Sequence, residues 1–261
     1  MRATPPFTAP SWPPAMTEET AERGERIAKF LSRAGVASRR DAEAMIEAGR
    51  VRMNNEAATH PAMFVKKGDL VVVDGKPVNE PERTRLFRYH KPDGLVTTHK
   101  DPEGRPTVFD SLPPGMPRVI SIGRLDLTSE GLLLLTNDGE LSRRLELPDT
   151  GWLRRYRVRV HGGVSQEKIR RLAEGMVVER VKYGPIEAAI DSVQRSNTWL
   201  SMSLREGKNR EIRRVMQALE LPVTRLIRVA YGPFQLGNLP RAGIEEVPGK
   251  ILREQVPGLS K

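Results

Sequence analysis

The chain has 261 residues, enough for a sizeable hydrophobic core and one smaller additional module. Its 43 Lys and Arg outnumber its 33 Asp and Glu, which gives a formal net charge of +10. This charge favours an anionic polymer such as nucleic acid as partner; the alternative is that the chain is simply a generally basic protein. Without cysteine, disulfides and thiolate zinc sites are excluded, and the four histidines lack metal-ligand spacing, so we predict no metal site.

No apolar run approaches the roughly 20 residues that span a bilayer. Residues 1–21 are rich in proline and lack the apolar core of a secretion signal, which predicts a disordered tail. We therefore expect a cytoplasmic protein that does not associate with membranes.

Residues 22–80 have the pattern of a small α+β module. Apolar residues recur at helical spacing from Ile27 to Ala34. Ser38, with Asp41 three positions later, approximates a capping box that opens a second helix. Short strand patterns follow at residues 51–54, 70–73 and 76–78.

Basic side chains gather on these two predicted helices: Arg26, Lys29, Arg33, Arg39 and Arg40. Arginines and helix N-termini favour phosphate, although a solvated helix face explains the same charges equally well. The segments 26–43 and 46–51 resemble the αL-type RNA-binding domain of a small-subunit ribosomal protein and of tyrosyl-tRNA synthetases. The resemblance implies that the five basic residues bind structured RNA through its shape and backbone.

A polar linker at 79–84 leads into a second module, residues 84–255. There, apolar residues at 119–122 and 132–135 predict two strands, joined by the loop Gly123–Gly131. The loop carries Arg124 and Asp126 two residues apart, on the same side of an extended stretch. A rigid scaffold that presents both groups is a plausible place for chemistry, whereas a turn-capping Asp126 and a solvated Arg124 are the alternative.

The sequence Gly-Arg-Leu-Asp-x-x-x-x-Gly-Leu-Leu-Leu-Leu-Thr-Asn-Asp-Gly at 123–139 resembles the catalytic motif of the RsuA/RluB family of RNA pseudouridine synthases. The resemblance implies that Asp126 is catalytic and that Arg124 helps to hold the target nucleotide out of the RNA helix. Residues 91–94 match the family's Lys-Pro-x-Gly segment, but His90 replaces its more usual Asn, and we assign His90 no role. Residues 104–113 resemble the RluB branch, which modifies large-subunit (23S) ribosomal RNA.

Tyr156 lies in an alternating strand pattern between basic residues. From this pattern alone, a tyrosine packed on the sheet is the favoured interpretation. The family resemblance instead implies that Tyr156 stacks on the target uracil. Ser165 is expected to cap the helix that follows.

Residues 205–216 form a second basic cluster, in which Asn209 is the expected N-cap of a helix. The apolar stripe of this helix places Arg213 at its edge, whereas Arg214 points well away. Residues 207–214 match the family pattern Gly-x-Asn-Arg-x-Ile-Arg-Arg, which implies that Arg213 pairs with the catalytic Asp126. Lys208 and Arg210 are expected to contact the RNA backbone.

Together these patterns predict an α+β fold: a small αL-type RNA-binding domain, then a mixed, mainly antiparallel sheet with flanking helices. The predicted activity is isomerisation of a uridine in ribosomal RNA by base flipping and Asp126-dependent glycosidic cleavage, with no cofactor. We expect a monomer whose partner is 23S rRNA, either free or in a pre-ribosomal particle. A non-catalytic ribosome assembly factor and an RNA glycosidase that releases uracil are the alternatives.

Overall fold

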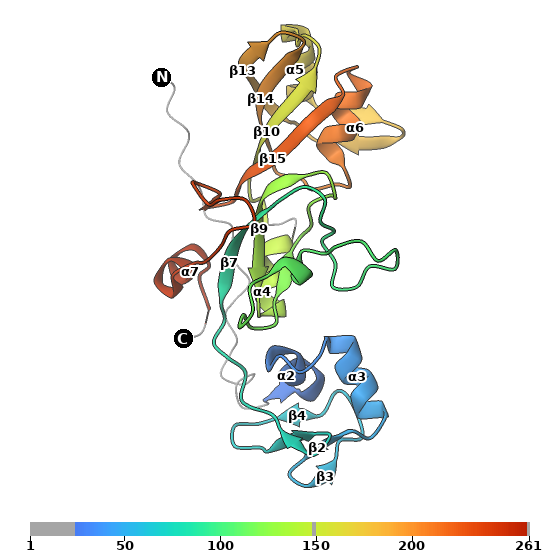
Figure 1. Ribbon diagram of the computed structural model, residues 1–261, viewed down its shortest axis with the longest axis vertical. Helices are drawn as coiled ribbons and strands as arrows, with labels where there is room; N and C mark the ends of the chain where they lie inside the picture. Colours follow the sequence, from blue (N-terminus) through green and yellow to red (C-terminus); the bar gives the residue numbers. More distant parts are fainter. Residues whose placement is uncertain (1–23, 148–149, 260–261) are drawn as a thin grey trace.

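The computed structural model describes residues 24–147 and 150–259; the predicted tail, 1–21, lies outside the described residues. Figure 1 shows a small N-terminal region below a larger region built on one long sheet. In the described part of the chain, no helix is long and apolar enough to cross a membrane.

The small region packs two helices over short strands. The helices are α2 (Ile27–Arg33) and α3 (Arg39–Glu47). A four-stranded sheet has the order β3 (Glu56–Ala57), β2 (Val51–Met53), β5 (Val71–Val73) and β6 (Lys76–Pro77), and β1 (Glu25–Arg26) pairs with β4 (Phe64–Val65). The Ser38 hydroxyl accepts a hydrogen bond from the Asp41 amide at 3.1 Å and donates one to the Asp41 carboxylate at 2.6 Å, so the predicted cap of α3 is confirmed.

The large region is built on a nine-stranded sheet, and the predicted mixed, mainly antiparallel α+β architecture is confirmed. Its main path runs through β13 (Glu187–Gln194), β14 (Asn197–Leu204), β10 (Arg154–His161), β15 (Val223–Tyr231), β9 (Glu130–Thr136), β7 (Leu86–Lys91) and β17 (Ile244–Glu246). At its sides, β8 (Ile120–Ile122) pairs with β9, and β16 (Phe234–Gln235) pairs with β15. Only β9 and β15 pair in parallel among these described strands.

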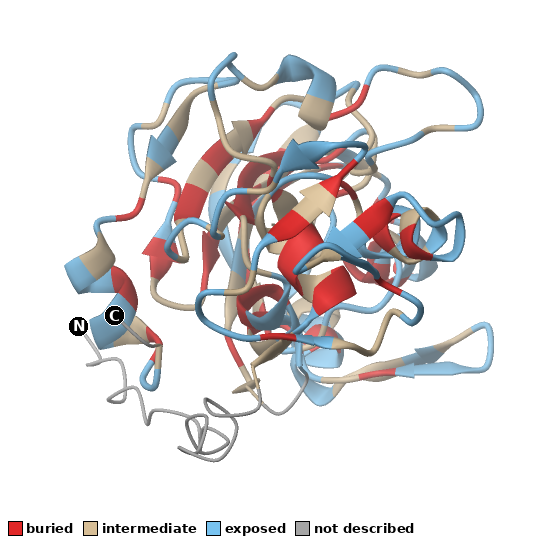
Figure 2. Ribbon diagram, turned by 90° about the horizontal axis from the view of Figure 1, so that it is seen from below, coloured by how far each residue is buried: buried red, intermediate tan, exposed pale blue. Residues whose placement is uncertain are grey.

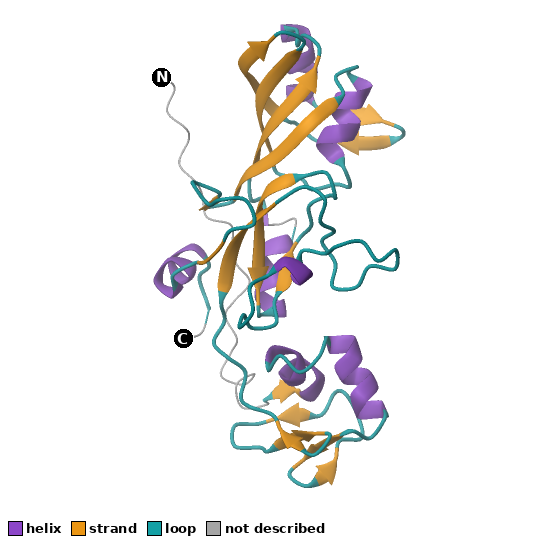
Figure 3. Ribbon diagram, in the orientation of Figure 1, coloured by secondary structure: helices purple, strands orange, loops and turns teal. Residues whose placement is uncertain are grey.

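Helices flank both halves of this sheet, as Figure 3 shows. They are α4 (Gly139–Glu146), α5 (Gln166–Glu174), α6 (Glu211–Ala218) and α7 (Gly249–Gln255), with a short 3₁₀ turn at Phe109–Ser111 and a separate hairpin of β11 (Met176–Val178) and β12 (Val181–Tyr183). Ser165 caps α5 through the Lys168 amide, as predicted. Figure 2 shows buried residues along the strands and the inner faces of the helices.

Gly131 allows β9 and β15 to approach closely at the end of the motif loop. Arg228 on β15 is its register partner. A Cβ atom at position 131 would lie 2.2 Å from the Arg228 carbonyl oxygen, and the Gly131 φ of +101° disfavours any other residue. The motif glycine therefore fixes where the loop joins the sheet.

The two regions contact each other through Lys29 of α2. Its ammonium lies 2.8 Å from the Glu140 carboxylate of α4 and 3.3 Å from that of Glu25. Lys29 therefore joins the small region to the large one by an ion pair.

Candidate active site

The candidate site is the loop between β8 and β9, which carries Asp126. Leu125 is buried, and its carbonyl accepts a hydrogen bond from the Thr97 hydroxyl at 2.9 Å. The Asp126 carbonyl closes a turn by accepting from the Ser129 amide at 3.0 Å. With Leu125 held inside, the Asp126 carboxylate comes to the surface, where 29 % of its side chain is exposed.

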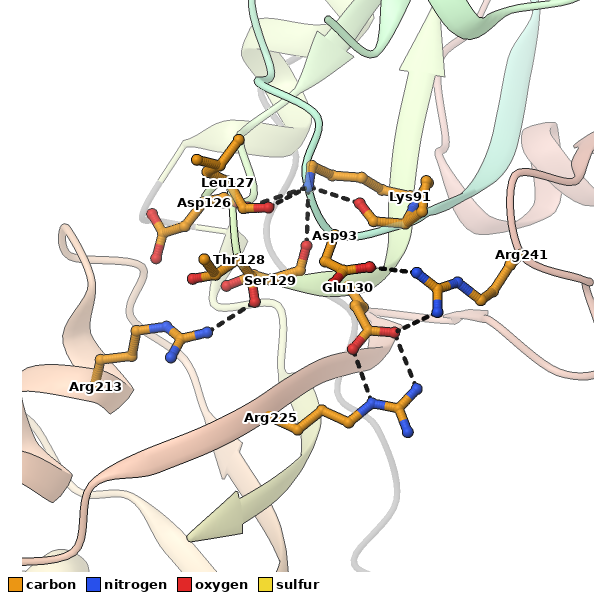
Figure 4. A network of polar contacts seen from close by, with 11 residues as sticks. Lys91, Asp93, Asp126, Leu127, Thr128, Ser129, Glu130, Arg213, Arg225 and Arg241 are labelled. Carbon is orange, nitrogen blue, oxygen red and sulfur yellow. Dashed lines mark hydrogen bonds and ion pairs between the residues drawn. The ribbon is translucent and has the colours of Figure 1, made fainter. Parts of the chain in front are cut away.

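Lys91, at the end of β7, supports this loop from within the protein (Figure 4). Its ammonium donates to the carbonyls of Pro92 (2.9 Å), Asp126 (3.1 Å) and Ser129 (2.9 Å), with a longer contact of 3.4 Å to Leu127. A single buried cation therefore holds the backbone on both sides of the Asp126 side chain.

Burial lowers the pKa of Lys91 to about 8, although the carboxylates of Asp93, Asp126 and Glu130 partly oppose this shift. From the sequence we assigned Lys91 no role beyond its place in the Lys-Pro-x-Gly segment. The strand pattern did contain a signal, because Lys91 alternates with the buried Phe87 and Tyr89 and so belongs on their face of β7.

The structure corrects the expected partner of Asp126. Its carboxylate lies 3.4 Å from the guanidinium of Arg210, which was expected to contact RNA backbone. Arg213 instead donates to the Thr128 carbonyl at 2.9 Å and to the Val223 carbonyl at 3.3 Å. Figure 4 shows Arg213 pointing at the loop backbone beside Asp126.

The start of α6 also differs from the prediction. The N-cap is Arg210, in a left-handed conformation (φ 50°), and not Asn209 as predicted. The buried Glu211 carboxylate accepts from the Lys208 amide at 2.9 Å and satisfies the helix start from inside. The Lys208 ammonium forms a surface ion pair with Glu206 at 2.6 Å.

Arg213 remains within electrostatic reach of Asp126. Burial, followed by repulsion from Arg210, lowers the pKa of Arg213, and the Asp126 carboxylate opposes that shift. The catalytic candidate thus lies beside two guanidinium groups, one in direct contact and one that holds its loop.

A third set of contacts fixes the far end of the loop. The buried Glu130 carboxylate accepts two hydrogen bonds from Arg225 of β15, at 2.8 and 3.0 Å. Arg241 lies 3.9 Å from Glu130 and also pairs with Asp93. Hydrogen bonding from Arg225 is the main reason that the pKa of Glu130 is lowered. Figure 4 shows this bridge between the loop, β15 and the C-terminal segment.

Three further residues singled out in the sequence lie in the large region. Tyr156 is half-buried on β10 and packs against the cluster that includes Val158 and Ile212 of α6, so it lies on the α6 side of the sheet. Arg124 is exposed at the start of the loop. His90, which we assigned no role, donates from Nδ1 to the Leu239 carbonyl at 2.8 Å and thereby contacts the C-terminal segment.

In the small region, two of the four basic candidates other than Lys29 form internal ion pairs. Arg33 lies 3.2 Å from Glu25, and Arg39 lies 3.5 Å from Glu43. Arg26 and Arg40 are exposed.

Comparison with known proteins gives this arrangement a family. Residues 85–218 match the model of the RNA pseudouridylate synthase family, and residues 25–71 match the S4 domain. A Rickettsia felis protein named as an uncharacterized RNA pseudouridine synthase is 44% identical over 230 residues, covering 88% of this chain and 100% of that protein. The ribosomal large subunit pseudouridine synthase B of Salmonella typhimurium is 43% identical, covering 85% of this chain and 79% of its own length.

A solved pseudouridylate synthase structure has the same fold, with a TM-score of 0.63 at 23% identity over 89% of this chain and 100% of that chain. The sequence resemblance is thus confirmed at the level of the family. The chain belongs to the RNA pseudouridylate synthase family.

Proposed function

We propose that this enzyme converts a uridine of large-subunit ribosomal RNA to pseudouridine and that Asp126 is its catalytic residue. The observation that carries the proposal is the loop geometry: Lys91, Arg213 and Glu130 fix the backbone around Asp126 while its carboxylate stays partly exposed beside Arg210. Similarity to relatives named for the large ribosomal subunit, over 85% of this chain, supports the choice of RNA.

The reaction needs the uridine outside the stacked RNA, because its glycosidic bond is inaccessible within a helix. Flipping the nucleotide out costs about a few kcal/mol. In our account, Arg124 and the basic surface offset this cost by binding phosphate, and Tyr156 stacks on the extruded uracil.

Asp126 then begins cleavage of the bond between C1′ and N1, either by attack on the sugar or as a base. The bond electrons leave with the uracil, which rotates and forms a new bond from C5 to C1′. If Asp126 attacked the sugar, this new bond displaces its carboxylate from C1′; if Asp126 acted as a base, the sugar regains the proton that Asp126 removed. The C5 proton is lost to solvent and N1 is protonated, so atoms and charge balance without any cofactor. In our account the bound RNA covers the site and thereby limits competing hydrolysis.

We further propose a division of labour between the regions. The exposed Arg26 and Arg40 lie in the part that matches the S4 domain, and we assign to this part the docking of structured rRNA. The catalytic set lies within the larger region. In this proposal the protein acts as a monomer in the cytoplasm, on free rRNA or on a pre-ribosomal particle.

Release of tritium from [5-³H]uridine in transcribed 23S and 16S rRNA tests the activity and the choice of subunit. We expect release from 23S rRNA, loss of it in Asp126→Asn, and retention in the matched control Asp191→Asn on the exposed strand β13. Free uracil found by chromatography would identify a glycosidase. Binding without tritium release by the wild type would identify an assembly factor.

A further inference from the structure

A cavity of about 490 Å³ is lined mainly by residues of α6 and by Val178 and Glu179 of the hairpin of β11 and β12. Ligand sites in proteins commonly measure about 300–1,000 Å³, so this volume suits a ligand of nucleotide size. One wall carries Arg210, Arg213 and Arg214. None of the roles assigned above uses this cavity.

The arginine wall carries more positive charge than the cavity neutralises. The Glu179 carboxylate lies 3.9 Å from Arg214 and is itself 77 % exposed, so this pair is weak. Within the described chain, the buried Nε of Arg213 has no hydrogen-bond partner. Three arginines that line one cavity, with Glu179 as the carboxylate among its lining residues, favour an incoming phosphate.

The rest of the cavity suits a base. Val178 at the end of β11 and Val223 at the start of β15 provide apolar walls, and Gln217 of α6 adds an amide that can both donate and accept. Apolar surface with one amide group and adjacent arginines is the combination by which proteins hold an unstacked nucleotide.

Arg210 connects this cavity to the reacting position, because it lines the cavity and also contacts Asp126 at 3.4 Å. We infer that the cavity binds the nucleotide adjacent to the target uridine, with its base against Val178 and Val223 and its phosphate on Arg214. The inference rests on the proposed function and adds a second base-binding site beside the catalytic one. Flipping would then involve two neighbouring nucleotides.

Kinetics on an RNA hairpin that contains the mapped target uridine tests this inference. Arg214→Ala and Gln217→Ala should each raise KM about fivefold to tenfold, as expected for the loss of one partly exposed polar contact, with kcat within twofold of wild type. The matched control is Arg170→Ala, which removes the same charge from an exposed position on α5 and should leave KM unchanged.

A second measurement identifies the occupant. An abasic residue is placed in turn on the 5′ and 3′ sides of the target, and it should raise KM on one side only. With that abasic RNA, Gln217→Ala should raise KM no further than the wild type. Such non-additivity is the signature of two groups that contact each other. Full additivity at both sides, or an unchanged KM in both cavity variants, would overturn the inference.

These outcomes are distinguishable from failure of the proposed function. If the wild type releases tritium and the cavity variants behave like Arg170→Ala, the activity stands and the second site is wrong. If the wild type releases none, the proposed function fails. Titration of the uridine trinucleotide UpUpU against the side-chain amide resonance of Gln217 then reports on the cavity without turnover, and an unperturbed resonance also overturns the inference.

Discussion

Replacement of Lys91 by methionine tests how the loop of Asp126 is held. Methionine fills a similar volume but donates no hydrogen bond, so the carbonyls of Pro92, Asp126 and Ser129 lose their shared donor. Three bonds from a charged donor contribute about 5–9 kcal/mol at about 1.5–3 kcal/mol each.

Burial of the ammonium opposes that gain. The pKa of Lys91 falls from 10.5 to about 8, and this shift corresponds to a cost of roughly 3 kcal/mol at about 1.36 kcal/mol per unit. The hydrogen bonds outweigh the burial cost. We therefore expect Lys91→Met to lower the free energy of unfolding by about 2–5 kcal/mol.

The effect on catalysis should be larger than the effect on binding. A displacement of about 1 Å in a catalytic group can cost about a hundredfold in rate, so we expect kcat to fall by about that factor while RNA affinity stays within a few-fold. Tritium release and urea unfolding measure the two effects, with Lys250→Met on the exposed surface of α7 as control. A kcat near wild type in Lys91→Met would refute the claim that these carbonyl contacts position Asp126.

The pH dependence has a defined sign. Between pH 8 and pH 10.5 the unfolded chain keeps a proton on Lys91 that the folded protein has lost, so the burial cost disappears and stability relative to Lys91→Met rises with pH. Activity should change the opposite way above about pH 8, because a neutral amine offers only two N–H donors to the loop carbonyls. A wild-type rate that stays constant to pH 10 would contradict this expectation.

Three further predictions follow from other contacts. Gly131→Ala should unfold or severely destabilise the protein in thermal melts, because its Cβ would lie 2.2 Å from a carbonyl oxygen of β15. The control Gly104→Ala, whose Cβ would meet nothing within 4 Å, should cost only about 1–2 kcal/mol of backbone strain. Burial raises the pKa of Glu211 to about 6, so the free energy of unfolding falls as the pH rises from 4.5 to 6. Glu211→Gln should therefore stabilise the protein at pH 7.5 by about 1–2 kcal/mol, and equal urea midpoints of the two proteins at pH 7.5 would oppose this. Arg213→Ala should lose at least tenfold more kcat than Arg214→Ala, because only Arg213 donates to the loop backbone; equal losses would make both arginines a phosphate surface.

Much of the architecture could be predicted because local chemistry determines it. The capping side chains of Ser38 and Ser165 act within one helical turn, so the sequence identifies the starts of α3 and α5. The alternating residues of β10 and the apolar run of β9 likewise contain their own periodicity.

The polar contacts of the site depend on segments far apart in the chain. Nothing near Lys91 in sequence shows that its ammonium meets the Asp126 carbonyl, which is 35 positions away. Likewise, the contact between Arg210 and Asp126 joins residues 84 positions apart. The shift of the α6 N-cap from Asn209 to Arg210 is one residue, which lies within the uncertainty of any helix boundary inferred from sequence.

The most direct test of the account is a map of pseudouridines in rRNA from cells that lack this gene, complemented with either the wild type or Asp126→Asn. We predict that one large-subunit site loses its pseudouridine in the deletion, that the wild type restores it, and that Asp126→Asn does not, although both proteins are present at equal levels. An unchanged map in the deletion, or restoration by Asp126→Asn, would contradict the claim that this loop isomerises uridine in large-subunit rRNA.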